Sequence, residues 1–497
     1  MEDTIRFWPF DCVLVANRGE IAVRILKTVK RLGLKGAVVY HSVDARSVAV
    51  QLADAAVEIR GATPVAAYLD GDQIVAAALS VGAGAIHPGY GFLSENSVFA
   101  RACMQAGIVF VGPAPEVIDL MGDKVTARAF VSKAGFPVAP SAIEDDDPAT
   151  FVERARVVGA PLLIKPAAGG GGKGMRIVRN LALLEMEIER ARSEGKRYFG
   201  DGRLYAERYV ENPRHIEVQI FGDLHGNVVH FFERECSVQR RFQKIIEETP
   251  SPALTPQLRE KICETAAGIA RSAGYQNAGT VEFVYGNGEF YFLEVNTRLQ
   301  VEHPVTEKIT GFDLVHEQLR IAAGEPLGYQ QSQIKARGHA IEMRIYAEDP
   351  ARGFTPTTGS ILKLREPAGD GIRVDSGIAE GLAVTANFDP MLAKLIVYGP
   401  DRNQAIALAD KALSGYVVLG SKTNISFLRR VVTHAAFRSG DVHTGFLDAN
   451  PQIAADPEWA KNTVHKLLAA ACLVTRSMRD GADAVQDIHA AMGAWRN

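Results

Sequence analysis

The N-terminal part of the chain alternates between short apolar runs and segments with apolar residues at helical spacing. Residues 12–16 form an uninterrupted apolar run, and 20–32 carry apolar side chains three to four positions apart. A second run follows at 37–40, and the alternation continues through 74–79, 85–86 and 108–111. Strand, helix and strand in succession indicate parallel βαβ units. We therefore predict that about the first 110 residues form a doubly wound α/β domain, with ligands at the carboxyl ends of its strands.

The pattern changes twice further along the chain. A helix is predicted from Met121 to Ala134, followed by a linker and a small unit with strands at 161–165 and 175–178. Beyond Pro213, apolar and polar residues alternate at 216–220, which predicts antiparallel strands. Strands and helices are mixed from 338 to about 447, and a helical tail is predicted after 450. The fold class is α/β together with α+β.

Composition and charge exclude several classes of protein. The chain has 497 residues, 47% of them hydrophobic, and a formal net charge of −3, so extended disorder and binding of nucleic acid over a whole surface are disfavoured. Its five cysteines lie far apart, which argues against a disulfide framework and a cysteine zinc site. No signal peptide or membrane span is predicted, so we expect a cytoplasmic protein, with an organellar matrix as the alternative.

A glycine-rich loop, Gly169 to Gly174, lies between the lysines Lys165 and Lys173. Successive glycines allow backbone N–H groups to surround anionic oxygens, and the lysines neutralise charge, so we predict a phosphate-binding loop. It differs from a Walker A loop because no Ser or Thr follows Lys173. A flexible surface turn is the alternative. Since Lys165 ends an apolar strand, we expect an anionic partner for its ammonium group.

A β-hairpin is predicted over 280–296, with its turn within Gly286-Asn287-Gly288. A two-residue loop would place Glu282 opposite Leu293 and point two carboxylates to opposite faces. A three-residue loop moves the pairing by one position. It gives one face three oxygen-bearing side chains that suit Mg²⁺, namely Glu282, Glu294 and Asn296. A solvent-facing polar side of the hairpin is the alternative.

Two further segments are rich in charge. In 297–304, Arg298 is suited to binding an oxyanion and Glu302 to accepting its proton, although exposed Arg and Glu pairs are common. His303 is expected to be structural. In 233–244 charged residues crowd together, which by itself is typical of a solvated face, and Cys236 is expected to be a packed thiol.

Several long strings occur together in the order expected for one family. The chain resembles the biotin carboxylase component of biotin-dependent carboxylases, in the ATP-grasp superfamily, over about residues 10 to 450. The strings are Ala16 to Ala22, His87 to Asn96, Met121 to Lys124, the glycine loop, Glu211 to His215, Glu294 to Pro304, Gly338 to Arg344 and Phe388 to Met391.

The resemblance implies an ATP-grasp fold in five segments. They are an N-terminal α/β domain (1–122), a helical linker and lid with the glycine loop (123–210), a catalytic half (211–337), a C-terminal antiparallel-sheet domain (338–450) and a helical tail (451–497). Residues of about 139–209 would form the lid that closes over ATP and excludes water.

The resemblance also implies the reaction and its residues. ATP and bicarbonate would give carboxyphosphate and ADP, and the CO₂ released would be captured on N1′ of biotin.

Lys124 and Lys165 would bind ATP phosphates, Glu207 and Val210 the adenine side, and His215 and Gln239 the ribose or phosphate region. Glu282, Glu294 and Asn296 would hold Mg²⁺ or Mn²⁺. Lys244, Arg298 and the Gln300-Val301 segment would bind bicarbonate, Glu302 would deprotonate it, and Arg344 would stabilise the biotin enolate. The remaining cofactor-binding residues are Tyr90, Gly170, Gly171 and Gly172.

The chain departs from the family at two positions. Phe242 stands where many relatives have His, so one nucleotide or phosphate contact is expected to be missing or mediated by water. Ala168 replaces a glycine of some relatives, which stiffens the loop slightly.

No biotinylation tripeptide and no carboxyltransferase segment are visible in the sequence. We therefore expect the chain either to need biotin on a separate carrier protein or domain and a carboxyltransferase partner, or to be cut from a longer polypeptide. A homodimer or larger complex is also expected, with no nucleic-acid or membrane partner. The favoured acceptor is an acyl-CoA, with pyruvate or urea as alternatives. The competing functions are another ATP-grasp ligase and an inactive ATP-binding regulatory module.

Overall fold

A computed structural model describes residues 8–144, 147–166, 175–199, 202–456, 465–467 and 470. The described residues up to Ile453 belong to one compact unit, and the few described residues from Ala454 onward are assigned to a second. Most of the predicted helical tail therefore lies outside the described residues. No helix in the described ranges has both the length and the apolarity needed to cross a bilayer.

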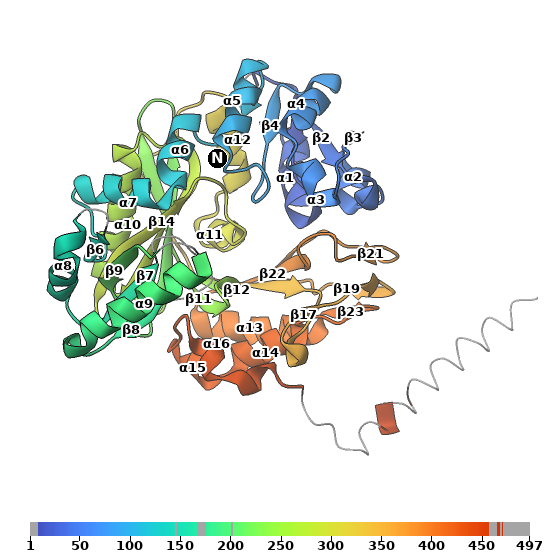
Figure 1. The fold of residues 1–497 in the computed structure, drawn as a ribbon. Coiled ribbons are helices and arrows are strands. Elements are labelled where there is room, and N and C mark those ends of the chain that lie inside the picture. The colour runs from blue at the N-terminus through green and yellow to red at the C-terminus, as the bar shows by residue number, and fades with distance from the viewer. Residues whose placement is uncertain are drawn as a thin grey trace, which may run out of the picture. The chain divides into compact units, whose positions relative to one another are not determined.

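The N-terminal region is built on a five-stranded parallel sheet (Figure 1). Its order is β3 (Ala55–Glu58), β2 (Lys35–Tyr40), β1 (Cys12–Val15), β4 (Ala85–His87) and β5 (Val109–Phe110). The helices are α1 (Gly19–Arg31), α2 (Val48–Leu52), α3 (Pro64–Tyr68), α4 (Gly71–Ser80), α5 (Ser97–Gln105), α6 (Pro115–Gly122) and α7 (Lys124–Lys133), with a 3₁₀ helix at Ser42–Asp44.

Both faces of this sheet are covered, which explains the continuous apolar run of β1. Val13 and Val15 pack into one core with α1. Leu14 packs into a second core, on the other face, with α4 and α5. A strand buried on both faces has no polar side, as is typical of parallel sheets between helices. The predicted doubly wound α/β domain is confirmed.

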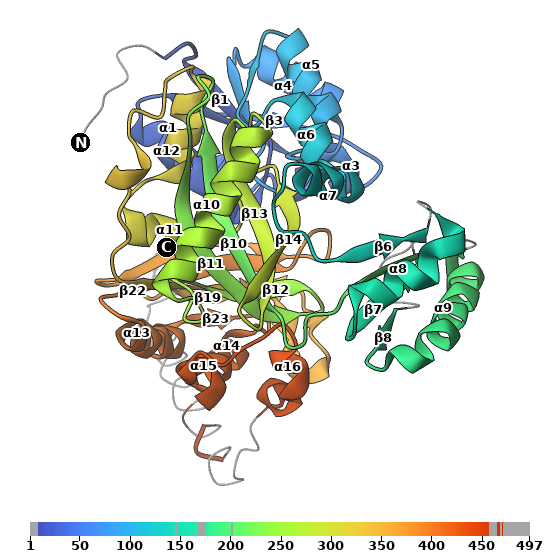
Figure 2. The same ribbon diagram turned by 90° about the vertical axis from the view of Figure 1, so that its left-hand side faces the viewer.

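A four-stranded antiparallel sheet follows, with two helices packed on one of its faces (Figure 2). Its order is β6 (Ser141–Ile143), β9 (Leu204–Arg208), β7 (Leu162–Pro166) and β8 (Arg176–Val178), and the helices are α8 (Phe151–Val158) and α9 (Leu184–Phe199). This small unit has a hydrophobic core of its own, centred on Phe151, Leu162 and Leu204. A separate core allows the unit to move as one body.

The largest sheet has eight antiparallel strands. Its order is β14 (Glu289–Asn296), β13 (Asn277–Gly286), β10 (Arg214–Gly222), β11 (Val228–Arg240), β12 (Gln243–Thr249), β15 (His339–Tyr346), β22 (Met391–Gly399) and β20 (Ile372–Ser376). The associated helices are α10 (Pro256–Ser272), α11 (His303–Thr310) and α12 (Leu314–Ala322). The sheet joins strands from the predicted segments 211–337 and 338–450.

Short strands and helices complete the C-terminal part. They are β16 (Glu348–Asp349), β17 (Thr355–Pro356), β18 (Gly359–Ser360), β19 (Lys363–Arg365), β21 (Ala383–Val384), β23 (Val417–Leu419), α13 (Arg402–Gly415), α14 (Ile425–Thr433), α15 (Ala435–Ser439) and α16 (Phe446–Ala449).

The alternation of apolar and polar residues in β10 gives the large sheet two different faces. Ile216, Val218 and Ile220 are fully buried in a core with α10, which lies across this sheet in Figure 2. Glu217 and Gln219 therefore point to the other face, because successive side chains of a strand alternate. Both of these polar side chains are also fully buried.

Candidate active site

A cavity of about 790 Å³ opens between the N-terminal region and the polar face of the large sheet. Its volume is in the range of pockets that enclose small-molecule ligands. The predicted site residues that line it are Tyr90, Lys124, His215, Gln239, Lys244, Glu282, Glu294, Asn296, Arg298, Gln300, Val301 and Arg344. The structure thus brings together residues from widely separated parts of the chain.

The two predicted metal-binding carboxylates lie on one face of the hairpin β13–β14, for a reason other than the predicted one. Gly286 pairs with Glu289, so the turn has two residues, and the predicted three-residue loop is wrong. A β-bulge at Leu293 then shifts the register by one position and sets Glu282 opposite Glu294. An extra residue in one strand moves everything beyond it to the other face. Asn296, two residues after Glu294, follows on the same face.

The crowded charges of 233–244 form part of the buried strand β11. Arg234 has no exposed surface, so the solvated face that the charge pattern favours is wrong. Its guanidinium donates to the Glu217 carboxylate at 2.5 Å, to Gln219 at 2.9 Å and to two threonine hydroxyls, Thr306 and Thr280. A buried charge is tolerated only when its donors are satisfied in this way.

Lys244 lies at the centre of the site and contacts three carboxylates. Its Nζ donates to Glu282 Oε1 and Glu302 Oε1, each at 2.8 Å, and to Glu217 Oε2 at 2.5 Å. Burial lowers the pKa of this ammonium, but the three carboxylates outweigh burial and hold the pKa well above its ordinary value. Lys244 is therefore a fixed positive charge in the cavity.

Glu302 lies behind the cavity wall, fully buried between two cations. Its Oε1 accepts from Lys244, and its Oε2 accepts from Arg344 Nη2 at 2.9 Å. Burial raises the pKa of Glu302, but Lys244, Arg344 and Arg234 together hold it well below its ordinary value. Cys236 Sγ is 3.9 Å from the same carboxylate, and burial raises the pKa of this thiol, so it is a packed, protonated group.

Arg344 also contacts one of two buried carboxyl groups that lie opposite each other, those of Glu247 and Glu342. Arg344 Nε donates to Glu247 at 2.6 Å, and Glu247 lies opposite Glu342 in the β12–β15 ladder. Burial raises the pKa of Glu247 to about 7, and it raises the pKa of Glu342 well above its ordinary value. Two buried carboxyl groups facing each other retain protons readily, which limits the negative charge around Arg344.

Arg298 is held at the cavity by groups from both sides. Its Nε donates to Glu95 Oε2 at 2.8 Å, and Glu95 also accepts from the Thr297 backbone at 3.1 Å. Its other nitrogens donate to Gln300 Oε1 at 2.9 Å and to Asn296 Oδ1 at 3.1 Å. The loop after β14 is thereby tied to the N-terminal region.

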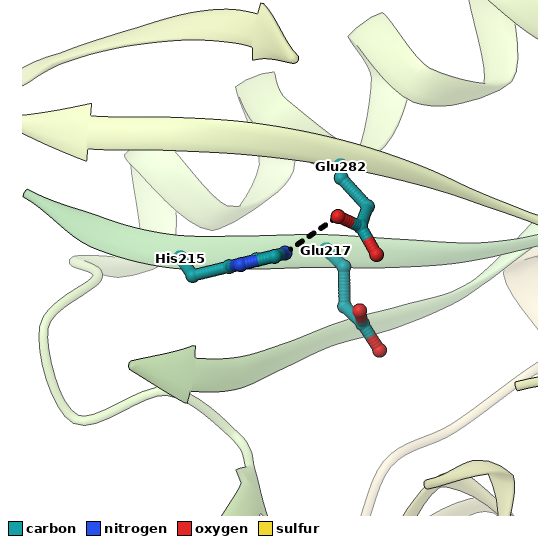
Figure 3. A group of neighbouring side chains, drawn as sticks. All are labelled: His215, Glu217 and Glu282. Carbon is teal, nitrogen blue, oxygen red and sulfur yellow. Dashed lines mark ion pairs between the residues drawn. The ribbon is translucent and has the colours of Figure 1, made fainter. Parts of the chain in front are cut away.

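Figure 3 shows three side chains close enough to share a cation, His215, Glu217 and Glu282. His215 Nε2 lies 2.8 Å from Glu282 Oε2, and Gln239 Nε2 lies 2.8 Å from His215 Nδ1. Lys244 already contacts both carboxylates of this group. A cation there would face the Lys244 ammonium. Glu282 and Glu294 both line the cavity. The pair of Glu282 and Glu294, in which Glu294 also pairs with Lys124, stays a predicted metal site.

The predicted nucleotide residues of the small unit lie outside the lining of the cavity. Lys165 Nζ pairs with Glu207 at 2.8 Å and is about one-third exposed, so its anionic partner in the structure is Glu207. Val210 packs against Gly286 of the large sheet. A Cβ added to Gly286 would lie only 2.4 Å from Val210 Cγ1. Gly170, Gly171 and Gly172, with Ala168, lie outside the described residues. Lys124 is exposed and pairs with Glu294.

Two aromatic residues at the rim differ in their partners. Phe242 lines the cavity with 82% of its surface exposed, at a hairpin tip where it and Arg241 both have positive φ. Its ring is presented to the cavity without a hydrogen-bonding group. The Tyr90 hydroxyl donates to Glu20, whose pKa burial raises to about 7.

Four residues that hold the predicted ones in place were not predicted from the sequence, namely Glu95, Glu217, Arg234 and Glu247. Glu217 follows His215 by two positions in a strand, a spacing that places both on one face and was available as a signal. Arg234 and Glu247 act across strand pairings, which no local spacing reveals. His303 is fully buried with Nδ1 2.8 Å from the Gln300 carbonyl, as expected of a structural histidine.

Three family models match the chain in order. They are the biotin carboxylase N-terminal domain over 9–118, the carbamoyl-phosphate synthase L chain ATP-binding domain over 123–330 and the biotin carboxylase C-terminal domain over 342–449.

Curated relatives match over most of their length. The biotin carboxylase of Halalkalibacterium halodurans is 51% identical over 443 residues, covering 88% of this chain and 97% of the relative. A pyruvate carboxylase component of Methanothermobacter thermautotrophicus is 48% identical, covering 88% and 90%. The mitochondrial methylcrotonoyl-CoA carboxylase alpha chain of Dictyostelium discoideum is 44% identical, covering 95% and 68%.

Solved structures with the same fold include enzymes with bound ligands. The biotin carboxylase domain dimer of the Hydrogenobacter thermophilus 2-oxoglutarate carboxylase, in complex with MgADP, ADP and bicarbonate, is 45% identical with a TM-score of 0.81, covering 90% of this chain and 99% of that one. The Campylobacter jejuni biotin carboxylase in complex with β,γ-ATP is 42% identical, also with a TM-score of 0.81, covering 89% and 99%.

Proposed function

The chain belongs to the biotin carboxylase family, and on that premise we propose how its side chains divide the work of carboxylating biotin with ATP and bicarbonate. This is the first half-reaction of a biotin-dependent carboxylase. Its two chemical events are the formation of carboxyphosphate and ADP, and the capture of the released CO₂ on N1′ of biotin.

The arrangement of Glu302 carries the proposal. This buried carboxylate is the only described acid that contacts both Lys244 and Arg344, and it lies beside the cavity that Arg298 lines. Bicarbonate held by Lys244, Arg298 and the Gln300-Val301 segment would present its proton to Glu302. An anion that takes over the Lys244 hydrogen bond leaves Glu302 with less positive charge, which raises its pKa and makes it a better base.

The nucleotide is assigned to the part of the cavity lined by His215, Gln239 and Lys124. His215 and Gln239, which contact each other, are placed to bind the ribose or phosphates, and exposed Lys124 neutralises phosphate charge. Lys165, Glu207 and Val210 act from the small unit, which we propose closes over ATP as a lid together with Gly170 to Gly172. Closure excludes water from the unstable mixed anhydride.

The carboxylates of Glu282 and Glu294 fit a magnesium or manganese ion. Both present oxygen ligands from paired positions of β13 and β14, while Asn296 donates its amide N–H to Glu282 at 2.9 Å and accepts from Arg298 through Oδ1. Once bound, the ion would neutralise charge on the phosphates. The chain itself holds Glu282 in place through Lys244 and Gln300.

Biotin is assigned to the side of the cavity formed by Tyr90 and Arg344. Arg344 is a permanently charged donor there, and its position is fixed by Glu247 and Glu302. A guanidinium fixed in advance stabilises the oxyanion that develops on the ureido group. Carrier protein and carboxyltransferase are proposed as partners, together with a homodimer, and a cytoplasmic or organellar-matrix location remains a prediction from the sequence.

The acceptor of the carboxyl group is decided by the carboxyltransferase, because this half-reaction ends at carboxybiotin. The relatives are named as pyruvate, 2-oxoglutarate and methylcrotonoyl-CoA carboxylases. An acyl-CoA acceptor is our proposal for this chain.

The test measures ADP formation and fixation of radiolabelled bicarbonate with free biotin. Wild-type chain is expected to release ADP only when bicarbonate is present, faster with biotin, and to form acid-labile carboxybiotin. ADP release at the same rate with and without bicarbonate and biotin would contradict the proposal and favour another ATP-grasp ligase.

A further inference from the structure

A second cavity, of about 230 Å³, adjoins the catalytic one. Its walls come from the loop 42–47 after β2 and from the segment 377–392, which contains β21. The two cavities share the residues at their junction, which are Arg18, Gly19, Phe388, Asp389 and Met391. None of the described residues lining the second cavity belongs to the proposed nucleotide or metal site. The second cavity therefore adjoins the first at a place outside the proposed nucleotide and metal site.

The junction is firmly built. Arg18 donates to both oxygens of Asp44, at 2.7 and 2.9 Å, and its guanidinium lies 3.9 Å from the centroid of the Phe388 ring. The Tyr68 hydroxyl donates to the same Asp44 at 3.1 Å. A two-point pairing combined with stacking fixes the guanidinium plane. The junction between the two cavities thus has a defined shape.

The size and lining of the second cavity indicate its occupant. It is smaller than the pockets of about 300 Å³ or more that enclose a free ligand. Its lining mixes apolar side chains, those of Val43, Ile378, Leu382, Val384 and Leu392, with polar ones, those of Ser42, Ser47 and Thr385. A small extension of a catalytic cavity with such a mixed lining suits a flexible tether that carries both methylene groups and an amide, as an acyl-lysine chain does.

We propose that this groove holds the biotinyl-lysine arm of a carrier domain, with the loop 42–47 at its mouth as part of the docking surface. The proposal rests on the proposed function, because it presumes that biotin is the substrate. The reactive ring lies in the first cavity and the acyl-lysine chain runs past Arg18 and Phe388 to the surface.

Arg46 indicates the chemistry of the docking partner. It is exposed at the mouth, and it forms no ion pair within the part of the chain that the structure describes. An uncommitted cation at an interface rim steers a partner of opposite charge. The carrier surface near the biotinylated lysine is therefore expected to be acidic.

Two variants outside the catalytic machinery test the groove. Arg46→Glu reverses the charge at the mouth, and Val43→Trp fills the groove from a side chain that is 46% exposed. The matched controls are Arg60→Glu, on a side chain that is 83% exposed, and Val98→Trp, on one that is 71% exposed, both away from the two cavities. Carboxylation is measured with free biotin and with a biotinylated carrier domain chosen because the wild-type chain carboxylates it.

We expect both variants to keep free-biotin activity within about twofold while kcat/KM for the carrier falls at least about fivefold, with the Arg46→Glu effect shrinking at high salt. The control variants should leave the activity with free biotin and the kcat/KM for the carrier unchanged. Unchanged carrier kinetics, or an equal loss with free biotin, would overturn the groove proposal alone. A wild-type chain inactive on free biotin would overturn the proposed function, and the groove proposal with it.

Discussion

Glu282 and Glu294 lie directly opposite each other across the β13–β14 ladder, although their hairpin turns through only two residues. The bulge at Leu293 makes this pairing possible, and Leu293 itself is 46% exposed. A surface residue with no chemistry of its own thus decides whether two carboxylates meet.

Deleting Leu293 should therefore disable metal binding, because the register without the bulge turns Glu294 and Asn296 to the opposite face. We expect Mn²⁺ binding, followed by electron paramagnetic resonance with ADP present, to weaken by about 10–100-fold. Leu293→Ala keeps the extra residue and serves as the control. Equal Mn²⁺ affinity in the deletion variant and the control would refute this role of the bulge.

Replacing Glu302 should separate binding from chemistry. Glu302→Gln retains the shape of the side chain but removes the proton acceptor, so we expect turnover to fall by about 10²–10⁴-fold with the Kd for ATP little changed. Glu289→Gln, at an exposed carboxylate of the hairpin, is the control. Turnover within a fewfold of wild type would show that another group accepts the proton.

Arg234 should be required for stability. Arg234→Met leaves Glu217 with one fewer buried cation, and removing one partner of a buried pair costs about 3–5 kcal/mol. Arg234→Lys should recover little of this, since one ammonium cannot reach Glu217, Gln219 and two threonines together. Urea denaturation followed by circular dichroism measures the loss, with Arg60→Met as an exposed control. A midpoint equal to that of the control would contradict this account.

The stability of the chain should fall with rising pH because of Glu20. Burial raises its pKa from 4.5 to about 7, so its protonated form stabilises the fold fully below about pH 4.5, and this contribution is lost as pH rises through 7. The difference between 4.5 and 7 corresponds to about 3 kcal/mol. Glu20→Gln cannot ionise, so its melting temperature should fall less than that of wild type between pH 5 and 8. Parallel pH profiles would show that Glu20 does not titrate there.

Phe242 should lower nucleotide affinity relative to a histidine at the same position. Its ring reaches the cavity without a donor, so Phe242→His is expected to supply one hydrogen bond and to lower the KM for ATP by about 2–10-fold with kcat nearly unchanged. Phe242→Leu, also without a donor, is the control. If the histidine variant matched the control in both parameters, the missing contact would be without importance.

The sequence by itself predicted the features that depend on local spacing. The apolar run at β1 and the helical spacing of α1 gave the βαβ unit, because a strand buried on both faces has no polar positions. The alternation in β10 predicted one apolar and one polar face. The long motifs identified the family, and most of the residues that they implied meet in one cavity.

The tertiary structure decided what depends on pairing between distant segments. The charges of β11 are buried because Glu217, Lys244 and Glu302 come to them from other strands and a loop, which a local charge pattern cannot reveal. The bulge at Leu293 likewise has no signal in the local sequence, because it depends on how the two faces of the hairpin pack against the core and the cavity. Spacing along a chain fixes which side chains share a face, but only long-range packing fixes which faces meet and whether a charge among them finds its counter-ion.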